Sequence, residues 1–428
     1  MKEELQLHYR LRECRLCQSA DLENVIKLAS TPAGNNFLNE KEIDQDSEPI
    51  FPLEVNFCND CFHLQLGHVV EPDHLFKNYH FVSGTSQVNI QHFDDYAENI
   101  ISTYDLKEGS FILDIGSNDG TNLKSFKRRN MRVLGVDPAE NVARIANNNG
   151  IETIPEYFSN VLAKKIRNQY GTPNLITSHN VLAHVDDFKG VMESIRALMD
   201  QNSIFIFEVG YFLDVFENLW FDTIYHEHLD YHTVSPLKDF FENIGMQLFH
   251  VERIDIQGGS IRNFVQLADG VYEVDKSVEK MIEQEARAGV HNSEILKNYQ
   301  KKVDESKSNL FNLLSDIKNS GKKIAGYGAP TKSTTLMAHF DISKNILDFI
   351  IDDNELKQNK YSPMLHIPIV SKDKLYDVPQ PEYLLVLAWN FSQSIIDKVN
   401  RENIFDGDYI IPLPEPKIVR GKKNESSR

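Results

Sequence analysis

The sequence predicts an α/β protein with three parts: a small amino-terminal zinc-binding module, a central doubly wound, Rossmann-like sheet, and a second Rossmann-like α/β domain near the carboxyl end. Two short apolar runs, at 111–116 and 322–328, each end in a glycine turn that a helical pattern follows. Such strand–turn–helix units build parallel sheets. All four cysteines precede them in two CxxC pairs, which predicts a separate metal-binding module.

Length and composition agree with a globular protein of several domains. A chain of 428 residues is too long for one compact core, so we expect two or three domains. No long apolar run and no signal-peptide core occur, so a cytoplasmic protein without a membrane span is expected. The net charge of −18 disfavours DNA or RNA as a partner, and no obligate protein partner is evident.

The cysteines form two CxxC pairs separated by 40 residues, Cys14 with Cys17 and Cys58 with Cys61. A tetrahedral zinc ion needs four converging thiolates, and two tight CxxC turns supply them. Disulfides are disfavoured in a cytosolic chain, and a redox CxxC would leave the second pair unexplained. Because protein ligands take all four positions, the zinc is expected to be structural. The module is expected to span residues 1–75.

The central domain, expected over residues 76–270, begins its sheet with the run FILDIG at 111–116. A turn-rich loop and a helix follow, and a second strand at 133–136 ends on Asp137. The alternation continues through a strand, a helix and another strand, at 174–177, 187–199 and 203–209. In a doubly wound sheet, ligands bind beyond the carboxyl ends of the strands.

The loop after the first strand, GSNDG at 116–120, indicates which cofactor binds there. It lacks the GxGxxG spacing that a dinucleotide pyrophosphate requires, and it places Asp119 where phosphate charges would sit. An acidic loop suits the ammonium and sulfonium groups of S-adenosylmethionine, and Asp137 suits the ribose hydroxyls. The segment 111–137 therefore predicts a methyltransferase, with a nicotinamide cofactor or an unrelated glycine turn as alternatives. The expected donor-site residues are Asp114, Gly116, Asn118, Asp119, Asp137 and Asn180.

Two polar segments are expected near the same edge of the sheet. Residues 178–185 follow one strand end and contain His179, Asn180 and His184, and residues 225–232, YHEHLDYH, follow another. HEH is not the HExxH of zinc hydrolases, so the open alternatives are a polar loop and acid–base catalysis by an imidazole that a carboxylate orients beside a tyrosine hydroxyl. Methyl transfer to carbon needs such a base, so the cluster favours a carbon acceptor.

The remaining chain divides into a connector, a domain and a tail. Charged helical patterns fill 271–320 as a connector, a second α/β domain is expected over 321–415, and a tail covers 416–428. Further strands of this domain are expected at 347–351 and 384–388. Its first glycine turn, GAPTKS at 328–333, is not a P-loop, but Lys332 and the hydroxyls at a helix start would suit phosphate groups. The alternative is a structural turn with a solvated lysine.

The motifs follow a specific order along nearly the whole chain, from about residue 10 to 415. They are CxxC…CxxC, FVSGTS (81–86), LDIGSNDGTNL (113–123), YHEHL (225–229), GGSIRNF (258–264), GYGAPTKS (326–333), DDNELKQNKYSPMLHIPI (352–369) and LAWNF (387–391). Together they resemble the sugar C-methyltransferases of deoxysugar biosynthesis, which act on nucleotide-linked 4-keto sugars. The resemblance implies a zinc module, a methyl-donor domain and a carboxyl-terminal domain that helps to hold the nucleotide sugar, here expected to be dTDP-linked.

The resemblance also implies a reaction. A base removes the proton from the carbon beside the ketone, and the resulting enolate attacks the methyl of S-adenosylmethionine. His228 is implied as the base with Glu227 orienting it, and Tyr225 is the alternative base. The other implied contacts are the keto oxygen for Tyr225 and Tyr79, the border of the sugar for His184, and the diphosphate for Lys332 and Arg262.

The chain departs from the family pattern at two places near the expected substrate contacts. Residues 333–335, STT, follow the lysine of the glycine turn, where the family usually carries a small residue and glycine, and PAGNNF at 32–37 replaces a commoner alanine-rich version. The sugar, its nucleotide and the methylated carbon therefore stay open. An O- or N-methyltransferase acting on a sugar or small metabolite is the alternative enzyme. A non-catalytic zinc-stabilised scaffold with a vestigial methyl-donor domain is the alternative of another class.

Overall fold

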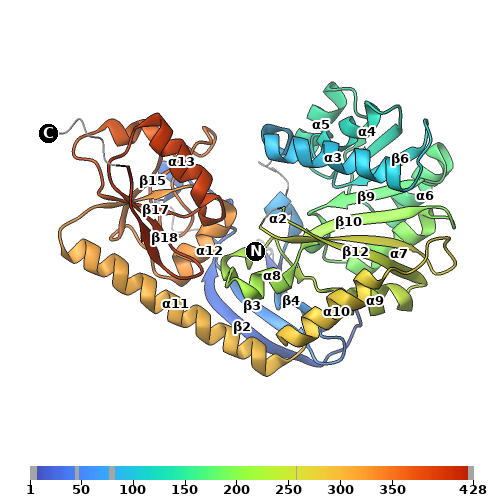
Figure 1. The fold of residues 1–428 in the computed structure, drawn as a ribbon, viewed down its shortest axis with the longest axis horizontal. Helices are drawn as coiled ribbons and strands as arrows, with labels where there is room; N and C mark the ends of the chain where they lie inside the picture. Colours follow the sequence, from blue (N-terminus) through green and yellow to red (C-terminus); the bar gives the residue numbers. More distant parts are fainter. Residues whose placement is uncertain (1–6, 44–47, 77–81, 257, 423–428) are drawn as a thin grey trace, which may run out of the picture.

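The computed structural model describes residues 7–43, 48–76, 82–256 and 258–422. Its central part is a seven-stranded sheet in the order β12-β13-β10-β9-β6-β7-β8 (Figure 1). The strands are β6 (Phe111–Ile115), β7 (Arg132–Val136), β8 (Thr153–Ile154), β9 (Leu175–His179), β10 (Ile204–Gly210), β12 (Met246–Ile254) and β13 (Ser260–Leu267). Strands β6 to β10 run parallel, and β13 is antiparallel to both neighbours. The predicted doubly wound sheet is confirmed, and β12 and β13 extend it beyond the predicted strands.

Helices cover both faces of this sheet. In Figure 1, α3, α4 and α5 lie above it and α7 and α9 below it, while α6 packs against α7. Their bounds are α3 (Gln87–Thr103), α4 (Thr121–Lys127), α5 (Glu140–Asn148), α6 (Asn160–Tyr170), α7 (Phe188–Leu198), α8 (Phe212–Glu217) and α9 (Val234–Asn243). Because both faces are covered, all five residues of β6 are buried, which explains the nearly continuous apolar run in the sequence.

The zinc-binding module is built on a four-stranded sheet in the order β11-β4-β3-β2. Its strands are β2 (Leu22–Thr31), β3 (Phe51–Cys58), β4 (Leu64–Leu66) and β11 (Asp230–Tyr231), and β1 (His8–Arg10) pairs separately with β5 (His68–Val70). Two short helices, α1 (Glu40–Ile43) and α2 (Pro72–Phe76), complete it. β11 comes from the middle of the chain, directly after the YHEHL motif, so residues 1–75 do not contain the whole sheet.

The carboxyl-terminal domain is a second α/β unit with the strand order β16-β15-β14-β17-β18-β19. Its strands are β14 (Ile324–Tyr327), β15 (Leu347–Ile351), β16 (Ile369–Val370), β17 (Tyr383–Val386), β18 (Asp408–Ile411) and β19 (Lys417–Val419), and its helices are α12 (Thr331–His339) and α13 (Ser392–Glu402). The sheet is parallel except at β19. The predicted glycine turn joins β14 to α12, as a strand–turn–helix unit requires.

Two helices connect the central and carboxyl-terminal sheets: α10 (Lys276–Ala288) and α11 (Ser293–Asn319). The long α11 runs along the lower edge of the molecule in Figure 1 and contacts β2 of the zinc-binding module. Its buried apolar residues recur at helical spacing, so one stripe faces the core: Leu296, Tyr299, Val303, Leu310, Leu314 and Ile317. Among the residues described, none of the helices combines the length and apolar character that crossing a bilayer requires.

A buried carboxylate joins α10 to the first turn of α9. Glu285 is fully buried and accepts hydrogen bonds from the backbone N–H groups of Val234 (2.6 Å) and Ser235 (3.1 Å). It also accepts one from the hydroxyl of Tyr211 (3.0 Å). The N-cap residue of α9, Thr233, makes no side-chain capping bond, so Glu285 supplies the cap from another helix.

We expect Glu285→Ala to lower the stability of the protein, because it leaves one buried and one partly buried helix N–H group and a buried hydroxyl without their acceptor. A loss on the order of 3 kcal/mol follows from such groups, and it should lower the melting temperature by roughly 5 °C. Circular dichroism melting checks this. Glu283→Ala on the same helix is the matched control, because that side chain is exposed and, among the residues described, pairs only with Arg287. Equal melting temperatures for both variants would contradict the capping role.

Candidate active site

The carboxyl ends of β6 and β7 form a polar loop at the edge of the central sheet. Asp137 follows β7, and its two oxygens accept hydrogen bonds from the backbone N–H groups of Asn118 (2.8 Å) and Ala139 (2.9 Å). Burial raises the pKa of Asp137. These bonds fix the carboxylate between two strand ends, the position at which sheets of this type hold a ribose.

Gly116 ends β6 in a conformation that suits only glycine. Its φ is +74°, and a Cβ at this position would lie 2.2 Å from Cγ2 of Val181. Val181 belongs to the loop after β9, together with Asn180, whose N–H donates to the carbonyl of Glu208 (2.8 Å). The missing side chain therefore lets the loops after β6 and β9 come together, which brings the predicted residues Gly116 and Asn180 to one edge.

Buried polar atoms at this edge fit a cationic ligand. Asp114 accepts one hydrogen bond, from Nδ2 of Asn122 (3.0 Å), and burial raises its pKa to about 6. The other oxygen of Asp114, the hydroxyl of Ser117 and Oδ1 of Asn122 are buried and have no hydrogen-bond partner among the residues described. Buried polar groups are normally paired, so these acceptors suit the ammonium group of a bound S-adenosylmethionine.

Asp119 was expected to face the cofactor, but its carboxylate bonds to the start of the next helix instead. Its Oδ1 accepts hydrogen bonds from the N–H (3.2 Å) and the hydroxyl (2.6 Å) of Thr121, so the carboxylate closes the first turn of α4. It thereby stabilises the loop at 116–120 from within. Residues Ser83–Thr85, part of the FVSGTS motif, cover this loop, and the N–H of Ser83 donates to Oδ1 of Asn118 (3.0 Å). The sequence alone does not predict this contact of Ser83, because its partner lies 35 residues away.

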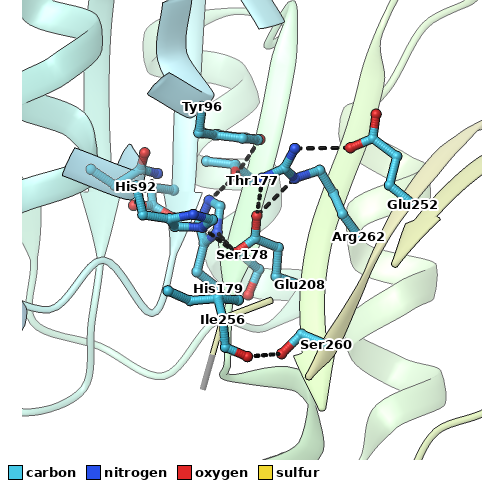
Figure 2. Close-up of polar contacts among 12 residues, drawn as sticks. His92, Tyr96, Thr177, Ser178, His179, Glu208, Glu252, Ile256, Ser260 and Arg262 are labelled. Atoms are coloured by element: carbon cyan, nitrogen blue, oxygen red, sulfur yellow. Dashed lines mark hydrogen bonds and ion pairs between the residues drawn. The ribbon is translucent and has the colours of Figure 1, made fainter. Parts of the chain in front are cut away.

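Figure 2 shows a buried cluster around Glu208 of β10. One carboxylate oxygen faces Nε2 of His92 on α3 (2.8 Å) and Nδ1 of His179 on β9 (3.0 Å). The other accepts from Arg262 on β13 (2.7 Å). Burial would raise the pKa of Glu208, but His179, His92 and Arg262 together hold it well below the ordinary range. The nitrogens of His92 and His179 and a carboxylate oxygen lie within 4.8 Å of one another, close enough for a metal ion.

Ion pairs and hydrogen bonds explain this cluster without a metal ion. Nε2 of His179 pairs with the hydroxyl of Thr177 (2.8 Å), and Nδ1 lies 3.0 Å from Glu208 as a charge contact without hydrogen-bond geometry. Arg262 spans Glu208 and Glu252 (2.9 Å) and stacks over a tyrosine ring, so its guanidinium is fully engaged inside the protein. The suggested contact of Arg262 with a diphosphate is therefore replaced by a role in this ion network.

The YHEHL motif forms the second polar centre. The hydroxyl of Tyr225 and Nε2 of His228 are 2.8 Å apart, and Nδ1 of His228 lies 2.9 Å from the carbonyl of Thr223. The ring of His184 packs edge-on at 5.1 Å. Burial lowers the pKa of His228 to about 3, and that of His184 to about 4. Both imidazoles are therefore neutral at pH 7, and Nδ1–H of His228 donates to Thr223, which leaves Nε2 as the acceptor from Tyr225.

The predicted orientation of His228 by Glu227 is wrong. Thr223 holds the imidazole, whereas the carboxyl of Glu227 accepts a hydrogen bond from Nδ2 of Asn35 (2.9 Å) in the zinc-binding module. Asn35 in turn accepts from the hydroxyl of Thr331 (2.7 Å) at the start of α12. Burial raises the pKa of Glu227 to about 7. Asn35 lies in the PAGNNF segment, but the sequence alone does not show that this segment joins three domains.

Lys332 is partly buried rather than fully solvated. Its Nζ lies 3.8 Å from the ring centroid of Trp389, a cation–π contact, and burial lowers its pKa. Trp389 donates from Nε1 to Asp222 (2.6 Å), which immediately precedes Thr223. Lys332, the predicted phosphate ligand, is therefore linked through Trp389 and Asp222 to the segment that carries Tyr225. Tyr79, the other predicted tyrosine, lies outside the residues described.

The four cysteines converge as predicted. Sγ of Cys14 lies 3.5 Å from that of Cys61, and Sγ of Cys17 lies 3.5 Å from that of Cys58. All four sulfurs lie within 4.8 Å of one another. Zn–S bonds of about 2.3 Å in a tetrahedron separate the sulfurs by about 3.8 Å. The four thiols therefore fit one structural zinc ion and leave no coordination position for a substrate.

Comparisons with known proteins agree with this geometry. Three family models match: "Putative zinc binding domain" over residues 14–76, "Methyltransferase domain" over 89–251, and "C-methyltransferase C-terminal domain" over 255–414. C-methyltransferase NovU of Streptomyces niveus is 34% identical over 407 residues, which cover 95% of this chain and 96% of that protein.

Solved methyltransferases align with less than half of the chain at low similarity. A Haloferax volcanii methyltransferase in complex with its activator Trm112 is 13% identical, with a TM-score of 0.33, and covers 42% of this chain and 94% of that one. Magnesium protoporphyrin IX methyltransferase of Synechocystis, with bound SAH, is 14% identical, with a TM-score of 0.33, and covers 42% and 87%. The length of the match to NovU decides the family: this chain is an S-adenosylmethionine-dependent methyltransferase that belongs to the C-methyltransferase family.

Proposed function

We propose that this enzyme methylates the carbon beside the ketone of a nucleotide-linked, dTDP-type 4-keto deoxysugar. The observation that carries the proposal is the pair formed by Tyr225 and His228, 2.8 Å apart, beside the donor domain. A neutral imidazole whose unprotonated nitrogen accepts from a tyrosine hydroxyl can move a proton, and methyl transfer to carbon requires proton removal. The resemblance to sugar C-methyltransferases supports a sugar acceptor.

The proton is handled by the chain's own residues. Thr223 fixes Nδ1–H of His228, so Nε2 is the atom that receives a proton, from the acceptor carbon or through the oxygen of Tyr225. A pKa of about 3 makes His228 a weak base in the free enzyme. Negative charge that develops on the enolate beside it raises this pKa as the reaction proceeds. Bound S-adenosylmethionine supplies the electrophilic methyl.

The other site residues receive roles that follow from their places. The donor would be held by Asp137 at its ribose and by Asp114 at its ammonium group, with Gly116, Asn118 and Asn180 forming the wall of the cradle. His184 borders the acceptor beside His228, and Tyr79 remains proposed for the keto oxygen. Lys332 is proposed for the diphosphate, at the junction of α12 with the Tyr225 segment.

We expect Gly116→Ala to weaken the binding of S-adenosylhomocysteine at least tenfold, because its Cβ would collide with Val181 and separate the loops after β6 and β9. Isothermal titration calorimetry measures this affinity. Gly109→Ala is the matched control, since Gly109 also has a positive φ (+79°) but nothing lies within 4 Å of its Cβ position. Unchanged affinity in Gly116→Ala would exclude this edge as the donor site.

We expect His228→Asn to reduce methyl transfer to dTDP-4-keto-6-deoxyglucose by roughly 10³-fold, since general-base catalysis supplies about that factor. Affinity for S-adenosylhomocysteine should not change, because His228 does not contact the donor loop. Turnover and calorimetry test both statements, with His366→Asn, a histidine of the carboxyl-terminal domain, as control. Full turnover in His228→Asn would remove it from the mechanism.

The same substrate distinguishes carbon from oxygen or nitrogen methylation. In deuterated water and without the methyl donor, the wild type should exchange the proton beside the ketone, and His228→Asn should not. Methylation without such exchange in the wild type would favour an O- or N-methyltransferase.

We expect Glu227→Gln to be more stable than the wild type at pH 8 and not at pH 4. Burial raises the pKa of Glu227 to about 7, so the folded state favours the neutral acid. The contribution of the neutral acid to folding stability is fully present below the unfolded pKa near 4.3. It is lost as the pH rises through about 7. The difference at pH 8 is on the order of 3 kcal/mol. Melting temperatures of both proteins at the two pH values check this. An equal difference between variant and wild type at pH 4 and pH 8 would show that Glu227 is solvated rather than buried.

A further inference from the structure

The segment between Glu227 and Tyr231 lies against the zinc-binding module along its length. Asp230 and Tyr231 form β11, which pairs with Gln65 and Leu64 of β4. The carbonyl of Leu229 accepts a hydrogen bond from the N–H of Leu66 (2.8 Å). Backbone bonds of this kind set the position of a strand to within one residue, because a slip would turn every side chain to the other face.

Arg15, inside the first CxxC turn, reaches the same segment. Its side chain is 2% exposed, and its guanidinium lies 3.7 Å from the carboxylate of Asp230 and 3.3 Å from that of Asp186. It also donates to the carbonyl of Leu229 (3.4 Å). The N–H of Arg15 is fixed in turn by Oε1 of Gln65 (2.8 Å). We call each CxxC turn a zinc knuckle. The first zinc knuckle therefore holds this segment at two points, the backbone carbonyl of Leu229 and the carboxylate of Asp230.

His63, two residues after the last cysteine, holds the other side of Asp230. Its Nε2 lies 2.8 Å from Oδ1 of Asp230, and both side chains are fully buried. Each zinc knuckle thus contributes one cationic or hydrogen-bonding side chain to the same buried carboxylate. A buried charge held by two partners tolerates little displacement, because moving it away leaves it unpaired.

Leu229 and Asp230 directly follow His228, so the segment that the zinc-binding module holds leads into the proposed acceptor site. The N–H of Leu229 donates to the carbonyl of Ala183, and Ala183 precedes His184. His228, whose ring contacts His184, precedes Leu229. One residue, Leu229, is thus held by the zinc-binding module through its carbonyl and by Ala183, the neighbour of His184, through its N–H.

We propose that Arg15 and His63 are positioning residues, through which the two zinc knuckles set the geometry of His228 and His184 by holding Leu229 and Asp230. Their catalytic consequence rests on the proposed function, whereas the coupling itself does not. If Arg15 and His63 only joined the two domains, replacing them would change stability alone. If they position His228 and His184, replacing them lowers turnover while donor binding and zinc content stay unchanged.

The experiment compares Arg15→Met with Arg12→Met, an exposed arginine in the same segment, in the full-length zinc-loaded protein. Three measurements need no acceptor: zinc content by mass spectrometry, affinity for S-adenosylhomocysteine by calorimetry, and hydrogen–deuterium exchange of amides 225–231. For Arg15→Met we expect one zinc ion, unchanged affinity and at least tenfold faster exchange. With dTDP-4-keto-6-deoxyglucose, kcat should fall at least tenfold at an unchanged KM for S-adenosylmethionine, and Arg15→Lys should restore part of it.

Equal exchange rates and equal kcat in Arg15→Met and Arg12→Met would overturn the proposal. Asp230→Asn is the second variant in case Arg15→Met does not fold, because the amide keeps an acceptor for His63 and loses only the charge that Arg15 needs. It should show the same faster exchange, and protection equal to the wild type would also overturn the proposal. If the wild type does not methylate the sugar while exchange responds as expected, the proposed function fails and the coupling stands.

Discussion

The pairing of β11 with β4 decides how the parts of this protein fit together. By sequence, β11 belongs to the central domain, but its hydrogen bonds place it in the sheet of the zinc-binding module. Glu227, three residues earlier, reaches Asn35 and through it Thr331 of the carboxyl-terminal domain. Three domains therefore meet around one short segment, and none of them can shift without breaking backbone or buried polar bonds.

Much of this arrangement can be predicted from the sequence, because strong local patterns carry it. The apolar run at β6 with its glycine turn, the two CxxC pairs and the glycine turn after β14 each specify a local structure without help from distant residues. The contacts of Asn35, Glu208 and Asp230 could not be predicted in the same way. Each depends on a partner at least 54 residues away in the sequence, which no local pattern encodes. The orientation of His228 failed for a related reason, since neighbouring side chains such as Glu227 diverge while a carbonyl five residues away lies within reach.

Two buried carboxylates, Glu208 and Asp230, solve the same electrostatic problem in the same way. Each is shared between an arginine and at least one histidine that come from other elements. Removing one partner of such a group typically costs about 3–5 kcal/mol, because the charge that remains is uncompensated. These clusters therefore specify which elements lie next to each other more than they add to total stability. One fixes α3 over the central sheet, and the other fixes the zinc-binding module beside the segment that carries His228.

The late position of β11 along the chain also affects synthesis. Strand β4 ends at Leu66, and its partner begins at Asp230, 164 residues later. At about 5–20 residues per second, translation needs roughly 10 to 30 s to produce that partner. During this interval the zinc knuckles can load their metal, but the edge of β4 stays open, and an open sheet edge is a template for wrong pairing. The sheet of the zinc-binding module, most of which is made before the central domain, is thus completed only after β11 has been made.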